Sequence, residues 1–192
     1  MIGLVMCINI YDFEFNKTCD AFPEQYDVTS SDGNPVGYVR LRHGVIECRY
    51  PDVDGKYIYY QGVKDNLAGY FENDDERMYH LKEIAEEIYK HIELDEAQKT
   101  LKPCPFCGGE AEFCEGKTEL RYNAGYYVNC KECMANTGEC VSLDYHRAIE
   151  QSVKDWNKRT PDIEKITSEV FLMGNRVWIG GHGYFVKEDG NE

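Results

Sequence analysis

Alternating apolar and polar positions in residues 1–70 predict an antiparallel sheet. Val39 and Leu41 alternate with Arg40 and Arg42, as the side chains of a half-buried strand do. Clusters of Gly, Pro, Asp and Asn separate this run from its neighbours and indicate tight turns. The strands expected from this pattern are 26–29, 36–42, 45–50 and 57–60. Because short turns join antiparallel neighbours, we expect a β meander.

A helical pattern follows the meander. Asn73 is the expected N-cap, with Glu76 three residues on as its capping partner. Apolar residues then recur at intervals of three and four and form one stripe, which we expect to pack on the sheet. The stripe consists of Met78, Leu81, Ile84, Ala85, Ile88 and Ile92. Residues 93–101 are polar, so we expect a domain boundary near Thr100.

The last third of the chain predicts a second helix and further strands. The helix is expected from about Leu143 to Arg159, with Trp156 on its inner face and Pro161 beyond its end. Gly174-Asn175 lies between two apolar runs and indicates a hairpin. Strands this short and apolar need a partner, so we expect those within 163–187 to pair with the N-terminal sheet.

Two cysteine pairs between these helices predict a metal site. Cys104 and Cys107 form one C-x2-C motif, and Cys130 and Cys133 form a second, with 22 residues between the pairs. Two intervening residues let both sulfurs of a pair turn to one point, and four thiolates complete a tetrahedral site. The expected ion is structural Zn²⁺, although four sulfurs also suit iron. With all four positions occupied by protein, the site has no open position for catalysis.

The predicted fold class is therefore α+β. An antiparallel β-rich N-terminal domain with one amphipathic helix covers 1–100 and is completed by strands in 163–187. A zinc ribbon followed by a helix covers 101–160, ahead of the C-terminal strands.

Charge and cysteine content limit the functions open to this chain. The net charge of its 192 residues is −14, and residues 1–100 hold 20 acidic against 10 basic side chains. Such a chain repels phosphate backbones, so we expect the chain alone to have only weak non-specific affinity for nucleic acid. Nine cysteines without a signal peptide indicate a reducing compartment, and we expect a cytoplasmic location. No apolar run is long enough to span a membrane. The oligomeric state is left open.

The cysteine segment resembles the Lar restriction-alleviation family. The resemblance rests on Leu101-Lys102-Pro103-Cys104-Pro105-Phe106-Cys107-Gly108-Gly109, on Val128-Asn129-Cys130-Lys131-Glu132-Cys133, on Ala148-Ile149 and on Trp156-Asn157-Lys158-Arg159. It covers about 60 of the 192 residues. The resemblance implies a phage or prophage origin, a bacterial cytoplasm, and a role in blunting host restriction by protein contact.

Three residues depart from the pattern of that family. Met134 stands where the family has glycine after the second pair, and a left-handed methionine is costly, so that turn could be shaped differently. Cys114 and Cys140 are additional, and either could replace an expected ligand.

Our first functional hypothesis is an anti-defence protein that inhibits a host enzyme acting on nucleic acid. Its partner would have a basic surface, and the acidic first helix could imitate DNA phosphates for that surface. The residues expected to bind this partner are Asp74, Asp75, Glu76, Glu83, Glu86 and Glu87.

Other functions have less support in the sequence. A zinc-ribbon regulator that binds nucleic acid would have to use the basic residues Lys117, Arg121, Lys131, Arg147, Lys154, Lys158 and Arg159. We expect no enzyme, because no catalytic constellation is found. We assign Tyr57, Tyr59 and Tyr60 to the core and surface of the sheet, since net charge opposes a base-stacking platform. Arg40 and Arg42 should point off one sheet face, where we expect solvent.

Overall fold

A computed structural model describes residues 7–19, 21–63, 69–116, 124–158, 171–173, 176–179 and 182–185. The chain divides into two compact units, Met1–Ile92 and Glu93–Glu192. Residues 1–6, the basic residues Lys117, Arg121 and Arg159, and Pro161 lie outside the described residues.

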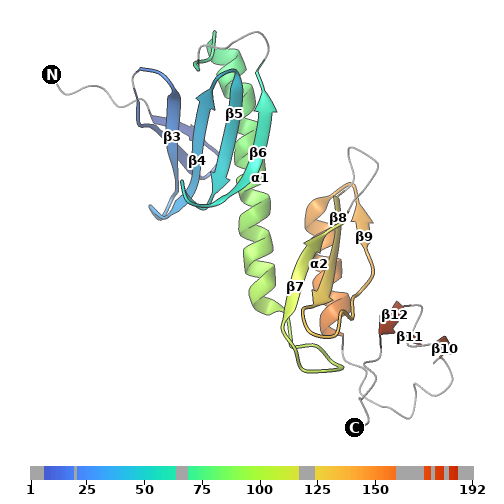
Figure 1. The fold of residues 1–192 in the computed structure, drawn as a ribbon. Helices are drawn as coiled ribbons and strands as arrows, with labels where there is room; N and C mark the ends of the chain where they lie inside the picture. The colour runs from blue at the N-terminus through green and yellow to red at the C-terminus, as the bar shows by residue number, and fades with distance from the viewer. Residues whose placement is uncertain are drawn as a thin grey trace. The chain divides into compact units, whose positions relative to one another are not determined.

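The first unit is a six-stranded antiparallel sheet with one face covered by helix α1 (Figure 1). Its strands follow one another in sequence order, so each pairs with the next along the chain. They are β1 (Cys7–Ile10), β2 (Phe13–Lys17), β3 (Glu24–Ser30), β4 (Pro35–Arg42), β5 (Val45–Tyr50) and β6 (Lys56–Gly62). The predicted meander and the α+β class are confirmed, with two more strands at its start than the turn signals indicated.

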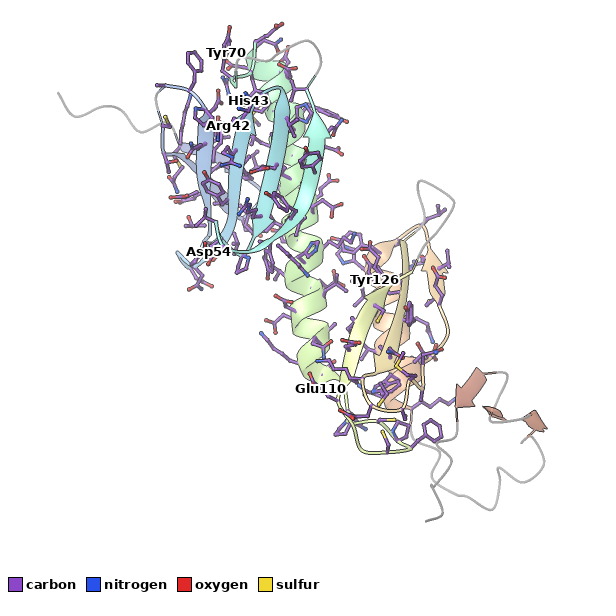
Figure 2. The ribbon with its side chains drawn as sticks, viewed as in Figure 1. Arg42, His43, Asp54, Tyr70, Glu110 and Tyr126 are labelled. Atoms are coloured by element: carbon purple, nitrogen blue, oxygen red, sulfur yellow. The ribbon has the colours of Figure 1, made fainter. Side chains whose placement is uncertain are left out.

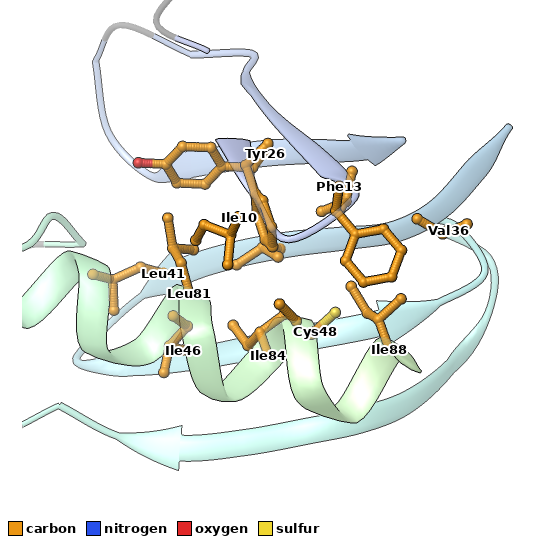
Figure 3. Close-up of a cluster of buried hydrophobic side chains, with 14 of the residues drawn as sticks. Ile10, Phe13, Tyr26, Val36, Leu41, Ile46, Cys48, Leu81, Ile84 and Ile88 are labelled. Atoms are coloured by element: carbon orange, nitrogen blue, oxygen red, sulfur yellow. The ribbon is translucent and has the colours of Figure 1, made fainter. Parts of the chain in front are cut away.

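The core of this unit lies between the sheet and α1 (Asp74–Thr100), as Figure 3 shows. Ile84 and Ile88 of the helix are fully buried against Ile46 and Cys48 of β5 and their neighbours. A Cβ at Gly37 would come within 2.9 Å of Cδ1 of Ile88, so glycine lets α1 approach β4 closely. The expected helical stripe is thus the face that α1 buries.

Helix α1 begins as the sequence indicates. The side chain of Asn73 accepts a hydrogen bond from the backbone N–H of Glu76 at 2.8 Å. The carboxylate of Glu76 accepts from the N–H of Glu72 at 3.2 Å, one residue before the position that a capping box would use.

A buried ion network joins α1 to β2 and β3. Glu24 is 2% exposed, and its carboxylate accepts a hydrogen bond from Nε of Arg77 at 2.8 Å and another from the hydroxyl of Tyr26. Lys17 Nζ lies 3.7 Å from the same carboxylate. Burial opposes ionisation of Glu24, but the hydrogen bonds from Arg77 and Tyr26 and the positive charges lower its pKa below the ordinary value. Glu24 is therefore a charged residue inside the unit.

The second unit contains a three-stranded antiparallel sheet in the order β7–β8–β9, with helix α2 packed on it (Figure 1). The strands are β7 (Ala111–Glu115), β8 (Ala124–Cys130) and β9 (Cys140–Ser142), and α2 is Tyr145–Asn157. Asp144 caps α2 by accepting from the N–H of His146 at 3.0 Å. Ser152 Oγ donates to the backbone oxygen of Tyr126 at 2.9 Å, which fixes the helix to β8.

Helix α1 extends further than predicted. Residues 93–101 are polar and were expected to lead up to a domain boundary near Thr100, but residues 93–100 form the last two turns of this helix. Leu94 and Ala97 pack against Ile149 of α2 and its neighbours, so they belong to the core of the second unit. Leu94 and Ala97 are three positions apart, which is helical spacing, but the polar residues around them hid this pattern in the sequence.

The C-terminal strands form a sheet of their own. These strands are β10 (Phe171–Met173), β11 (Arg176–Ile179) and β12 (His182–Phe185), and they pair antiparallel in that order. The expected pairing of 163–187 with the first sheet is not found among the described residues, because β10, β11 and β12 pair with one another instead. The predicted hairpin around residues 174–175 is present as the β10–β11 pair.

Candidate metal centre

The second unit brings the four predicted cysteines together at the end of its sheet. Their sulfur atoms all lie within 4.8 Å of one another. Cys104 Sγ and Cys133 Sγ are 3.6 Å apart, and Cys107 Sγ and Cys130 Sγ are 3.5 Å apart. A zinc ion with Zn–S bonds of about 2.3 Å requires tetrahedral sulfurs separated by about 3.8 Å. The four thiols therefore match the size of a structural Zn²⁺ site.

The two cysteine pairs lie in turns with the same backbone hydrogen bonds. In the first turn, Gly108 N–H donates to the oxygen of Cys104 at 3.0 Å, and Cys104 N–H donates to the oxygen of Gly109 at 2.8 Å. In the second, Met134 N–H donates to Cys130 at 3.1 Å, and Cys130 N–H donates to Ala135 at 2.8 Å. Each turn thus presents its two sulfurs with the same backbone hydrogen bonding.

Met134 takes the position that glycine has in the first turn. Gly108 has φ of +74°, and Met134 has φ of +63° with its side chain 57% exposed. The expectation that methionine would alter the second turn is wrong, since the turn keeps its hydrogen bonds. The backbone instead accepts a left-handed conformation that is unfavourable for a side chain with a Cβ.

Backbone N–H groups point at the sulfurs and stabilise their negative charge. Gly109 N–H donates to Cys107 Sγ at 3.4 Å, and the N–H groups of Glu132 and Cys133 donate to Cys130 Sγ at 3.4 and 3.5 Å. The bond from Gly109 lowers the pKa of Cys107 to about 7, whereas burial raises the pKa of Cys133 to about 12 and raises that of Cys104. Binding of zinc to these thiols must release protons, so zinc affinity falls as pH falls.

The additional cysteines are not part of this group. Cys114 on β7 lies opposite Tyr127 of β8, and Cys140 on β9 lies opposite Tyr126. Among the described residues, the cluster of potential metal ligands contains only the four predicted cysteines. The donor set and its geometry support structural Zn²⁺, with protein sulfur at every position.

Residues of the Trp156-Asn157 motif hold the segment that leads into the first cysteine pair. Trp156 Nε1 donates to the backbone oxygen of Lys102 at 2.7 Å. Asn157 accepts from the N–H of Lys102 at 2.8 Å and donates to the oxygen of Thr100 at 2.9 Å. The indole also packs with Cys104 and Cys130 in one buried cluster. These residues therefore support the metal site from the end of α2.

Gln98 is a contact residue that the sequence reading missed. Its side chain donates to the oxygen of Ala111 at 2.7 Å and accepts from the N–H of Phe113 at 3.0 Å. The last turn of α1 thus continues the hydrogen bonding of β7. A single polar residue in a polar segment carries no sequence signal for such a role.

The acidic residues expected to bind a partner are in the first unit, on α1. Asp74, Asp75, Glu83 and Glu86 are exposed, while Glu76 and Glu87 are half-buried. Asp74 pairs with Arg77, Glu87 pairs with Lys90 at 3.6 Å, and Glu86 accepts from the hydroxyl of Tyr11 at 3.3 Å. Asp75 and Glu83 are exposed, and neither forms an ion pair or a side-chain hydrogen bond with another described residue.

Two basic residues of the alternative ribbon surface are in ion pairs. Lys131 Nζ lies 2.7 Å from Glu110, and Arg147 Nε lies 3.6 Å from Asp144. These carboxylates reduce the positive charge that the ribbon presents.

The fold and the sulfur geometry define the second unit as a zinc ribbon with a supporting helix. The family model of restriction alleviation protein Lar matches residues 99–160, which confirms the resemblance for this segment. The match covers the four cysteines and the Trp156-Asn157 motif, and it connects the segment with restriction alleviation. No curated protein and no solved structure matches the chain.

Proposed function

We propose that this chain is a phage-derived anti-defence protein that binds and inhibits a host enzyme acting on nucleic acid. The observation that carries the proposal is the match of residues 99–160 to the restriction alleviation family. A metal site with four protein sulfurs supports a binding role, because it leaves no position for a substrate. The protein would act without catalysis of its own, in the cytoplasm of a bacterial host. No helix in the described part of the chain is long and apolar enough to cross a membrane.

The acidic face of α1 is the surface that we assign to the partner. A restriction enzyme or another immune nuclease holds DNA or RNA on a basic surface, which carboxylates can occupy in place of phosphates. Asp75 and Glu83 are exposed on this helix, and neither is needed for its N-cap or its buried network. Both can therefore be reversed in charge without loss of the fold.

The test measures plating of unmodified phage on a restricting host that expresses the chain, followed by cleavage assays with the purified nuclease. We expect the zinc-loaded chain to raise plating and to slow cleavage. The variant Asp75→Lys with Glu83→Lys should lose this inhibition. Asp32→Lys with Asp54→Lys is the matched control, because it changes the net charge equally at exposed turn positions. Unchanged plating with the wild-type chain would contradict the proposed function.

A further inference from the structure

The outer face of β4, β5 and β6 carries arginines and tyrosines in a chain that is otherwise strongly acidic. Figure 1 shows α1 behind the sheet, so this face is the one that the helix leaves uncovered. The strand registers place Arg40, Glu47 and Tyr60 in one row across the three strands, and Tyr38, Arg49 and Tyr57 in the next. We call these two rows, with Arg42, the Arg–Tyr face.

Two tyrosines of the Arg–Tyr face are open to solvent. Tyr60 is 70% exposed and Tyr57 is 54% exposed. Their ring centroids are 6.4 Å apart with an interplanar angle of 89°, so the two rings are in a T-shaped contact. Tyr59, which was grouped with them from the sequence, instead faces the core and contacts His80 through its hydroxyl at 3.1 Å. The exposed pair are therefore the tyrosines available to a flat ligand.

Arg49 holds the Tyr57 ring in place. The guanidinium carbon of Arg49 lies 4.4 Å from the centroid of the Tyr57 ring, and its nitrogens donate to the hydroxyl of Tyr57 and to the oxygen of Val53. A cation held against a ring orders that ring, and Tyr57 remains 54% exposed in this arrangement. The platform is thus formed before any ligand binds.

The charge of the Arg–Tyr face is positive at one end. Arg40 neutralises Glu47, whose carboxylate lies 2.6 Å from it and which is only 8% exposed. Arg42 is exposed, and no ion pair joins it to another described residue. Figure 2 labels Arg42 and Asp54 at opposite ends of the sheet, so the turn that contains Asp54 lies away from Arg42. From the strand spacing, Arg42 and Tyr60 are about 12 Å apart at their Cα atoms.

We propose that the Arg–Tyr face binds single-stranded nucleic acid. Bases would stack on Tyr60 and Tyr57, and the backbone phosphates would lie toward Arg42. Exposed aromatic rings on a sheet face with arginine beside them are what single strands require, whereas the stacked bases of a duplex offer no ring face. The net charge of the whole chain weakens long-range attraction, so the rings contribute most of the affinity. An acidic peptide could use Arg42 but would leave both tyrosines without a role.

The test is fluorescence anisotropy with the full zinc-loaded chain and a labelled oligothymidine of about eight nucleotides at low salt. We expect saturable binding that Tyr60→Ala weakens at least about fivefold, the effect of one lost stack. Tyr60→Phe should retain binding, because it keeps the ring. Arg42→Ser should reduce the slope of log affinity against log salt by about 0.7. Tyr79→Ala is the matched control, since Tyr79 is similarly exposed at 55% but lies on α1.

Several outcomes would overturn the proposal. Absence of binding at low salt would do so, as would equal affinity for a duplex of the same length or equal competition by a polyglutamate peptide. Binding that survives Tyr60→Ala but is lost in Lys131→Glu would place nucleic acid on the ribbon instead. Circular dichroism and zinc content establish that each variant is folded. Inhibition of a defence enzyme is a separate measurement and can fail while this binding is observed.

Discussion

The second cysteine turn can be strengthened by a single substitution, Met134→Gly. A left-handed conformation costs a residue with a Cβ about 1–2 kcal/mol, and glycine removes that cost. Glycine in turn gives the unfolded chain extra freedom worth about 0.5–1 kcal/mol. Since the Met134 side chain is 57% exposed, little buried surface is lost. We therefore expect a net gain of about 0.5–1 kcal/mol.

The first turn provides the reverse experiment. Gly108 has φ of +74°, and a Cβ built there would meet no atom within 4 Å, so Gly108→Ala tests the backbone alone. This variant should lose about 0.5–1 kcal/mol for the same reasons. The double variant should return close to the wild-type value, because the two turns have matching hydrogen bonds.

Zinc affinity is the appropriate assay, because metal binding and folding of this unit are coupled. Competition with a chelator should show Met134→Gly binding zinc about two- to fivefold more tightly, and Gly108→Ala more weakly by a similar factor. Weaker binding by Met134→Gly, or no change in Gly108→Ala, would refute the assignment of strain to position 134.

Three further predictions concern the metal site and the first unit. Cys107→Ser should lose bound zinc while Cys114→Ser keeps one ion per chain, as elemental analysis of the purified variants will show. Arg77→Met leaves the buried carboxylate of Glu24 without its closest cation, so urea unfolding should show a loss of about 3 kcal/mol, of which Glu24→Gln in the same chain restores part. Burial lowers the pKa of His80 below its ordinary 6.5, which favours the neutral ring in the folded state. Stability from this residue is present above about pH 6.5 and is lost as pH falls through the folded pKa, so the urea midpoint should fall less on acidification in His80→Phe.

The parts of the structure that follow from the sequence depend on neighbours along the chain. The spacing of Cys104 and Cys107 prepares two sulfurs for one ion, and the stripe from Met78 to Ile92 marks the buried face of α1. Both patterns repeat over a few residues and have one dominant physical explanation. For this reason the four clustered cysteines and the start and buried face of the first helix agree with the prediction.

The parts that the sequence did not reveal depend on partners distant in the chain. Glu24 pairs with Arg77 across 53 positions, and neither residue has a local pattern that indicates burial. The exposure of Tyr57 and Tyr60 also depends on pairing between strands. A bulge next to Arg49 in the β5–β6 pair decides which tyrosines of β6 face outward. Alternation alone would place Tyr57 and Tyr59 on one side, and the structure places Tyr59 in the core.

The true start of the zinc-ribbon unit shows how a local sequence match can differ from a folded unit. The family match begins at residue 99, but the compact unit begins at Glu93. Leu94 and Ala97 enter its core before the match starts, and Gln98 supplies the hydrogen bonds to β7. A ribbon with few buried apolar residues gains from every such contact, because metal binding has to order the whole segment. The last two turns of α1 are therefore part of the core of the ribbon unit, although they belong to the same continuous helix as the residues that pack on the first sheet.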